Sequence, residues 1–160
     1  MAGGFGTRLR PLTAHLPKPL VPVGNVPVME HMVRLLKRHG FTDLCVLLYF
    51  LPDTITSYFG DGSRWGVKMT YVTPPADLGT AGAVKFAVGD SDEPVLVVSA
   101  DVLTDIDLAK AATFHKARGA EATMVLTRVE LPLAYGIVIT DEEGRVLRFL
   151  EKPAWGEVFS

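Results

Sequence analysis

The chain has 160 residues, of which 48% are hydrophobic and 21% charged, which suits one well-buried core better than two ordinary domains. We therefore expect a single domain over residues 1–160. The formal net charge of −2 gives no basic excess for a nucleic-acid backbone, so nucleic acid is not expected as a partner. The longest apolar run, residues 44–51, is far shorter than the ~20 residues of a membrane helix, so no membrane association is expected either.

Cys45 is the only cysteine, and it lies within that apolar run. A buried thiol that packs as a small hydrophobic side chain is the expected state there. No disulfide can form within the chain, which favours a reducing compartment. Because the N-terminus also lacks the apolar core of a signal peptide, the sequence predicts a cytoplasmic protein.

The first predicted feature along the chain is a long ordered loop over residues 2–25. It combines a cluster of glycines with prolines at positions 11, 17, 19 and 22, and both residue types interrupt regular structure. Loops of this length in compact domains are usually either functional or disordered. The loop is therefore the first place to look for a binding site.

The next segment predicts a helix, a strand, a short helix and a second strand. Apolar residues at helical spacing begin after Pro27 and end before Gly40, which indicates an amphipathic helix. Residues 44–49 are typical of a buried strand, residues 51–59 of a short helix, and residues 67–72 of another strand.

The same alternation continues in the second half. We expect a helix over about residues 81–88, a buried strand over 94–99 and a helix over 108–118. After Glu121 the composition changes, and the remaining strands are expected to pair antiparallel, the last two as a hairpin around residues 141–144. The predicted fold class is α/β, a Rossmann-like, mainly parallel sheet with helices on both faces that ends in an antiparallel hairpin. Ligands are expected at the carboxyl ends of the strands.

Several properties of the long loop indicate that it binds phosphate. Gly3, Gly4 and Gly6 let backbone N–H groups approach an anion closely and form a nest. Arg8 and Lys18 add positive charge, and the prolines stiffen the chain that carries them. The spacing fits neither a Walker loop nor a dinucleotide-binding loop. The alternative is a surface turn cluster that is merely rich in glycine, which the combination of arginine, lysine and four prolines makes the weaker interpretation.

The string from Gly3 to Thr13, followed by Pro17-Lys-Pro-Leu20, resembles the signature of the sugar-1-phosphate nucleotidylyltransferases. The match covers essentially the whole chain, and within the family it is most similar to mannose-1-phosphate guanylyltransferases, including forms fused to a phosphomannomutase domain. Further matching motifs are Met29-Glu-His31, Tyr58-Phe-Gly-Asp-Gly62, Leu78-Gly-Thr-Ala-Gly82, Ala100-Asp-Val-Leu-Thr-Asp105, Tyr135-Gly136 and Glu151-Lys-Pro153.

This resemblance implies a fold of the nucleotide-diphospho-sugar transferase type and a nucleotidyl transfer from an NTP to a sugar 1-phosphate. In the implied reaction a phosphate oxygen of the sugar 1-phosphate attacks the α-phosphorus in line and pyrophosphate leaves, with Mg²⁺ as cofactor. GTP and mannose 1-phosphate are the favoured substrates. Thymidylyl, uridylyl or adenylyl transfer to glucose 1-phosphate is an alternative, and so is a non-catalytic regulatory paralogue that binds sugar nucleotides.

The resemblance also implies roles for individual residues. Arg8 is expected to hold the leaving pyrophosphate, and Lys18 to bridge the reacting phosphates. Together with Lys152, these are the expected catalytic residues. The residues expected to bind the NTP are Ala2, Gly3, Gly4, Gly6, Thr7, Gly79 and Thr80.

Asp101 is the candidate metal ligand, because it follows a predicted strand and matches the family's aspartate motif. A turn or cap role is the usual alternative for such an aspartate, and Asp107, just before a helix, is expected to be an N-cap. The sugar phosphate is expected to contact Gly136, Glu151 and Lys152. A Glu–Lys pair at a strand end is otherwise usually only solvated charge.

The resemblance implies parts of the enzyme outside residues 1–160. The family has a strand before the loop, and its second metal-binding aspartate follows the Glu-Lys-Pro motif. We therefore expect a catalytic core truncated at both ends, which alone binds nucleotide weakly and turns over poorly. The parent protein is expected to be a homo-oligomer or to carry a fused C-terminal domain. A truncated, inactive product is the remaining alternative.

Overall fold

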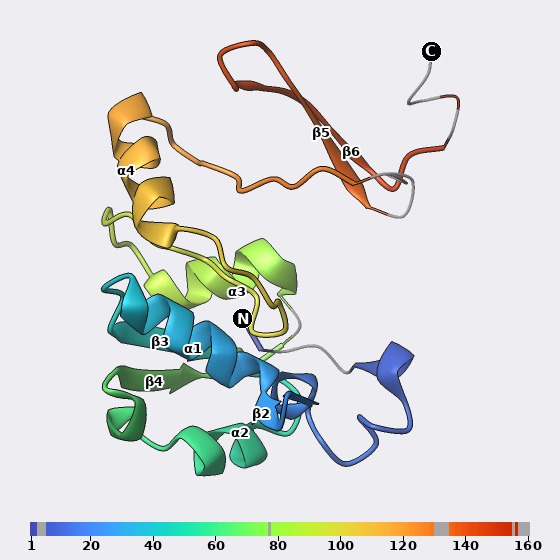
Figure 1. The fold of residues 1–160 in the computed structure, drawn as a ribbon, viewed down its shortest axis with the longest axis vertical. Helices are drawn as coiled ribbons and strands as arrows, with labels where there is room; N and C mark the ends of the chain where they lie inside the picture. Colours follow the sequence, from blue (N-terminus) through green and yellow to red (C-terminus); the bar gives the residue numbers. More distant parts are fainter. Residues whose placement is uncertain (3–5, 77, 130–134, 155, 157–160) are drawn as a thin grey trace. The chain divides into compact units, whose positions relative to one another are not determined.

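The computed structural model describes the chain except for residues 3–5, 77, 130–134, 155 and 157–160. The contacts group the chain into two compact units, Met1–Ala117 and Arg118–Ser160, whose elements are labelled in Figure 1. Within the described residues, no helix combines the length and the apolar character that crossing a membrane requires.

The loop predicted at the start of the first unit is present, with short regular pieces inside it. These pieces are η1 (Thr7–Leu9), η2 (Lys18–Leu20), β1 (Pro22–Val23) and β2 (Val26–Pro27). The antiparallel pairing of β1 with β2 is an addition to the expected loop. Its turn residues, Gly24 and Asn25, both have positive φ, as two-residue hairpin turns require.

The predicted amphipathic helix is confirmed as α1 (Val28–Arg38). It ends before Gly40, whose φ is 86°. One hydrophobic cluster joins α1 to β3, α2 and β4, and a second joins it to α4. The buried apolar residues of α1 are Val28, Met29, Met32, Val33, Leu35 and Leu36.

The predicted strand, short helix and strand are also confirmed. β3 (Asp43–Leu47) and β4 (Lys68–Val72) pair in parallel and lie side by side in Figure 1. The connection between them contains α2 (Pro52–Phe59) and η3 (Ser63–Trp65). Ile55 and Phe59 of α2 are almost fully buried, so apolar packing holds this helix in the core.

Glu30 is a charged residue buried in the first unit. Its carboxylate accepts hydrogen bonds from Tyr58 Oη at 2.8 Å and from Arg34 Nε at 2.9 Å. Burial alone would raise the pKa of Glu30, but these hydrogen bonds outweigh burial and hold the pKa below its ordinary value. The charged carboxylate therefore ties α1 to α2.

The remaining helices are α3 (Gly79–Val88) and α4 (Leu108–Arg118), both close to their predicted bounds. Asp107 caps α4 as expected, because the Lys110 N–H donates to its Oδ1 at 2.9 Å. This hydrogen bond lowers the pKa of Asp107, and the nearby His39 adds to the effect.

The strand expected over residues 94–99 is not formed, and this prediction is wrong. In the described residues, the backbone partner of this segment is Met1, whose α-amino group donates to Val98 O at 2.8 Å. The Ala100 N–H donates in turn to Met1 O at 2.9 Å. Apolar composition predicts burial, but a strand also needs a neighbouring backbone along its whole length.

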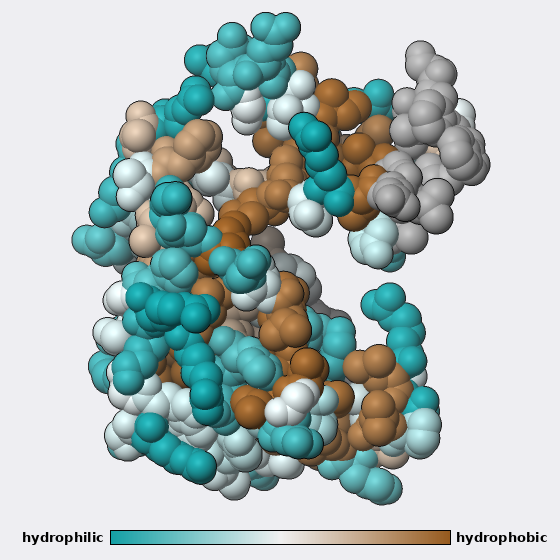
Figure 2. Space-filling model, viewed as in Figure 1, coloured by the Kyte–Doolittle hydropathy of each residue, from teal (hydrophilic) through white to brown (hydrophobic). Residues whose placement is uncertain are grey.

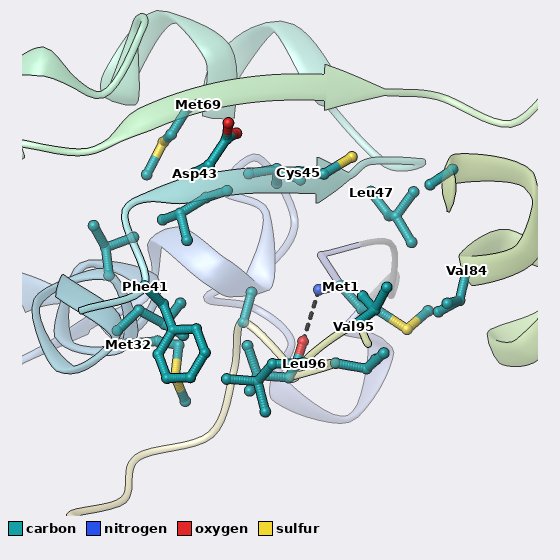
Figure 3. A pocket seen from close by; sticks show the side chains of 18 of the residues that line it. Met1, Met32, Phe41, Asp43, Cys45, Leu47, Met69, Val84, Val95 and Leu96 are labelled. Atoms are coloured by element: carbon teal, nitrogen blue, oxygen red, sulfur yellow. Dashed lines mark hydrogen bonds between the residues drawn. The ribbon is translucent and has the colours of Figure 1, made fainter. Parts of the chain in front are cut away.

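An apolar groove of about 320 Å³ lies between β3 and residues 94–98. Figure 3 shows Val95 and Leu96 across the groove from β3, with Phe41 toward one end, Val84 toward the other and Met1 between them. The groove follows the edge of β3 that does not face β4.

Cys45 lines this groove and is exposed, so the expectation of a buried thiol is wrong. The physical reason is the open edge of β3. On that edge the described residues provide one isolated bridge, between Ala2 and Leu48. Because this edge of β3 is mostly unpaired among the described residues, the side chains of the strand are only partly buried.

The second unit contains the predicted hairpin, formed by β5 (Gly136–Thr140) and β6 (Val146–Glu151). In its turn, the Arg145 N–H donates to Asp141 Oδ1 at 2.7 Å. The strand expected after Glu121 is not assigned over residues 122–129, which corrects that prediction. The described residues offer that segment no partner strand, and apolar side chains remain at the surface of this unit (Figure 2).

The expected fold class is confirmed. The first unit has a parallel strand pair connected through a helix, and the second unit has the antiparallel hairpin. The corrections to the predicted strands concern two segments that contain sheet-forming residues but have no partner strand among the described residues.

Candidate active site

The long loop closes on itself around Gly6. Gly6 has a φ of 63°, and its carbonyl accepts a hydrogen bond from the buried Thr13 Oγ1 at 2.7 Å. A Cβ on Gly6 would lie 3.0 Å from Thr13 Cγ2 and 3.3 Å from Lys18 Cβ. Glycine is therefore favoured at this position by both the backbone conformation and the space.

Lys18 projects from a rigid turn of the same loop. It begins η2, and its neighbours Pro17, Pro19 and Leu20 are buried. The two prolines restrict the backbone on both sides. The Lys18 side chain is 33% exposed and lines a cavity, so a restricted backbone presents the ammonium group to that cavity.

Asp101 meets Lys18 across a separation of 83 residues. Lys18 Nζ donates a hydrogen bond to Asp101 Oδ2 and forms an ion pair with it. Asp101 directly follows the buried Ala100, whose N–H is bonded to Met1 O. The fold thus joins the predicted lysine and the predicted metal ligand.

A cavity of about 390 Å³ lies beside this ion pair, a size within the range of small-molecule sites. Lys18 and Asp101 are the only charged side chains among the described residues that line it. Most of the other described residues of the wall come from the end of β3 and from the start of α3 with the segment before it, namely Leu47, Leu48, Tyr49, Pro74, Ala76, Leu78, Gly79, Thr80 and Ala83. The cavity therefore has one charged part and a wall of small and apolar residues.

Gly79 and Thr80 line this cavity at the beginning of α3. The first turn of a helix presents backbone N–H groups and the positive end of the helix dipole. The N-cap residue, Leu78, makes no side-chain capping hydrogen bond. The start of α3 therefore adds the positive end of a helix dipole to the wall of the cavity.

The other predicted NTP contacts occupy different positions. Ala2 lines the cavity, but its N–H donates to Leu47 O at 2.8 Å, so its backbone anchors the loop to β3. Thr7 and Arg8 are exposed on η1 and are not among the residues that line the cavity. Gly3 and Gly4 lie outside the described residues.

The second unit brings together the predicted sugar-phosphate residues at the end of its hairpin. Gly136 pairs with Glu151, and the Lys152 N–H donates to Tyr135 O at 3.2 Å. Lys152 Nζ lies 3.7 Å from Glu151 Oε1. A Cβ on Gly136 would lie 2.8 Å from Phe149 Cζ and 3.1 Å from Glu151 Oε2, so Gly136, Glu151 and Lys152 form one cluster.

Asp101 suits the role of a single metal ligand. The described part of the chain holds no group of three or more His, Cys, Asp or Glu side chains that could bind a metal ion. Mg²⁺ in nucleotide sites is commonly held by one or two carboxylates together with phosphate oxygens and water. The carboxylate of Asp101 already attracts the ammonium of Lys18, so a cation is favoured at this position.

Comparison with known proteins identifies the family of the chain. Residues 1–158 match the nucleotidyl transferase family model. The chain belongs to the nucleotidyl transferase family. This nucleotidyl transferase chain is 41% identical over 159 residues to a mannose-1-phosphate guanyltransferase of Aspergillus oryzae, with 96% of this chain and 44% of the relative covered. It is 39% identical over 174 residues to a UTP–glucose-1-phosphate uridylyltransferase of Synechocystis, with 100% of this chain and 45% of the relative covered.

A solved structure shows the same fold. The UDP-glucose pyrophosphorylase from Acinetobacter baumanii superposes with a TM-score of 0.76 at 26% sequence identity, covering 97% of this chain and 67% of that one. The nucleotidyl transferase chain spans less than half the length of the curated relatives it matches.

Some residues of the cavity wall were not expected from the motifs. Leu48 and Tyr49 follow β3, while Pro74 and Ala76 follow β4. Their signal in the sequence was position. Leu48 and Tyr49 are the last residues of the predicted strand 44–49, Pro74 and Ala76 follow the predicted strand 67–72, and α/β sheets bind ligands at such strand ends. Thr13 does not line the cavity. It ends the motif string that begins at Gly3, but its hydrogen bond to Gly6 depends on the folded shape of the loop.

Proposed function

We propose that this protein transfers a nucleotidyl group from an NTP to a sugar 1-phosphate, with GTP and mannose 1-phosphate as the favoured substrates. The observation that carries the proposal is the Lys18–Asp101 pair at the cavity beside the start of α3. A lysine and a carboxylate suit a triphosphate and its metal ion. The small and apolar wall suits a planar base and a ribose.

In the proposed reaction an oxygen of the sugar 1-phosphate forms a bond to the α-phosphorus of the NTP. The bond from the α-phosphorus to the oxygen that bridges to the β-phosphorus breaks, and pyrophosphate leaves with the electron pair. Lys18 neutralises charge on the reacting phosphates, and the loop around Gly6 orients them. Asp101 would hold Mg²⁺, which when bound neutralises phosphate charge.

The remaining predicted residues complete the proposal. Arg8 holds the leaving pyrophosphate, Glu151 accepts hydrogen bonds from sugar hydroxyls, and Lys152 binds the sugar phosphate. Their support is the motif match together with the clustering of Gly136, Glu151 and Lys152 on the hairpin. Removing the Lys152 charge should raise the KM for the sugar 1-phosphate more than the KM for the NTP.

UTP with glucose 1-phosphate is the second candidate, because the relatives that use the two substrate pairs are almost equally similar to this chain. The deciding experiment is a panel of NTP and sugar 1-phosphate pairs scored by pyrophosphate release. Highest turnover with GTP and mannose 1-phosphate supports the favoured pair, and highest turnover with UTP and glucose 1-phosphate replaces it. Binding of NDP-sugars without pyrophosphate release from any pair would instead indicate a regulatory paralogue.

We also propose that the groove beside β3 takes an extended apolar segment that continues backward from Met1. The backbone of Met1 and Ala2 already lies between two neighbours, with bonds to Leu47 on one side and to Val98 and Ala100 on the other. A segment on the same line would pair in parallel with β3 and cover the apolar lining of the groove (Figure 3). It would also anchor the start of the phosphate loop.

An N-terminal extension tests this proposal. A Val- and Ile-rich segment of about five residues, matching β3 at about 3.3 Å per residue, should raise Tm by about 5 °C or more and tighten NTP binding. An equally long segment of Asp, Pro and Gly serves as the control and should do neither. Equal effects of both segments, or no effect of the apolar one, would contradict the proposal.

A further inference from the structure

The Lys18–Asp101 ion pair joins the long, flexible side chain of lysine to the short side chain of aspartate. Both backbones are fixed, since Lys18 follows the buried Pro17 and Asp101 follows Ala100, which is hydrogen-bonded to Met1. The lysine ammonium sits on a flexible four-carbon stem, whereas the aspartate carboxylate has a single methylene group. If the pair separates, the ammonium is the group that moves.

No other charged side chain lines the described wall of the cavity. The α-amino group of Met1 also lines it and interacts electrostatically with Asp101, but it donates its hydrogen bond to Val98 O at 2.8 Å. A divalent cation that arrived alone would have to displace the ammonium of Lys18 and would gain the single carboxylate of Asp101. A triphosphate changes this balance, because its oxygens attract the ammonium and also coordinate the cation. The pair is therefore easier to open with nucleotide than with metal alone.

We propose that Lys18 is the resident cation of Asp101 until a nucleoside triphosphate arrives, so that divalent metal binds Asp101 together with the nucleotide and not before it. This inference rests on the proposed function, since it takes an NTP as the ligand. Lys18 therefore has two roles. It pairs with the carboxylate of Asp101 before the nucleotide binds, and it binds the phosphates afterwards. The site is thereby kept from filling with metal in the absence of substrate.

The first test is a Mn²⁺ titration of the nucleotide-free chain, followed by the electron paramagnetic resonance signal of free Mn²⁺. Lys18→Met should bind Mn²⁺ about three- to ten-fold more tightly than the wild type, the range expected for releasing a partly exposed ion pair. Lys18→Arg keeps the charge and should bind as weakly as the wild type. Adding Asp101→Asn to Lys18→Met should abolish the gain.

Arg10→Met is the matched control, because it removes one positive charge from an exposed residue of the same loop that does not line the cavity. Its Mn²⁺ affinity should stay within about two-fold of the wild type, a shift no larger than a surface charge gives. Circular dichroism should show that each variant is folded. The proposal is overturned if Lys18→Met binds no more tightly than the wild type, or if Arg10→Met gains as much.

The second test repeats the titration with a GTP analogue that carries a methylene group between the α- and β-phosphorus. The wild type should gain more Mn²⁺ affinity from the analogue than Lys18→Met does, after correction for Mn²⁺ bound by the analogue alone. An equal gain in both overturns the coupling. If the nucleotide-free result holds while the substrate panel releases no pyrophosphate, the proposed function fails by itself.

Discussion

The first unit positions Lys18 and Asp101 through a buried core, whereas the second positions Glu151 and Lys152 through the pairing of two exposed strands. In the first unit the two side chains meet across 83 residues, and each is held by buried neighbours. In the second unit the register of β5 and β6 is enough to bring Gly136 next to Glu151.

This difference teaches how each of the two residue groups can be disturbed. Non-local contacts bring Lys18 and Asp101 together, so substitutions far from the cavity should disturb this pair. Local strand pairing places the hairpin cluster, so that cluster should tolerate the loss of most side chains around it. The two units offer matched residues with which to test this contrast.

The largest expected difference is between the losses of stability caused by removing one phenylalanine from each unit. Phe59 is 2% exposed and Phe149 is 52% exposed. Phe59→Ala should lower the free energy of unfolding by about 3–5 kcal/mol and abolish NTP binding, because it leaves a cavity in the core. Phe149→Ala should cost less than about 1 kcal/mol, since little area is buried there. Urea unfolding of both variants measures the contrast, which similar losses would refute.

The next effect concerns a carboxylate in each unit. Asp101→Asn should lower kcat about 100-fold or more, because a preorganised charge next to the reacting phosphates is lost. Glu151→Gln should raise the KM for the sugar 1-phosphate a few-fold and leave NTP affinity unchanged, as loss of one hydrogen-bond acceptor would. Steady-state kinetics with the best substrate pair separates the two outcomes. A lower NTP affinity in Glu151→Gln would mean that the two roles are not separate.

A smaller effect is expected from the buried Glu30. Its pKa is lowered in the folded state, so its contribution is present above the pKa of the unfolded chain and is lost as pH falls through the folded pKa. Glu30→Gln should cost about 2 kcal/mol at pH 7, and the gap from the wild type should close in acid. Unfolding measured between pH 7 and pH 3 tests this. Glu151→Gln, on an exposed pair, should change stability by less than about 0.5 kcal/mol.

The smallest effect is expected from a methyl group on a glycine in each unit. Gly6→Ala should cost about 1 kcal/mol, because its positive φ disfavours a Cβ, and it should weaken NTP binding by pushing on Thr13 and Lys18. Gly136→Ala meets mainly the ends of the exposed Phe149 and Glu151 side chains, which can move aside. NTP titrations should show a loss for Gly6→Ala alone.

The sequence predicted the helices well because their signals are local. The spacing of apolar residues located α1, and Asp107 marked the start of α4. The hairpin in the second unit was equally legible from its turn residues. The glycine- and proline-rich loop was recognised by composition, and its motifs placed the chain in its family.

Predictions that depended on distant partners were less secure. Residues 94–99 have the composition of a buried strand, yet a strand forms only where another backbone lies alongside. Cys45 was expected to be buried by its apolar neighbours, but one edge of β3 is open to the groove. The composition of a segment indicates its tendency to form a strand or to be buried. It does not show which other segment packs beside it.

The sequence alone determined the residue types of the phosphate loop, the order of the elements and the identity of Asp101 as a candidate ligand. Only the tertiary structure decided that Lys18 reaches Asp101, that Ala2 anchors the loop to β3, and that the start of α3 borders the same cavity. The physical reason is that periodicity and turn chemistry act over a few residues. Ion pairs and cavities, in contrast, are made by packing between segments far apart in the chain.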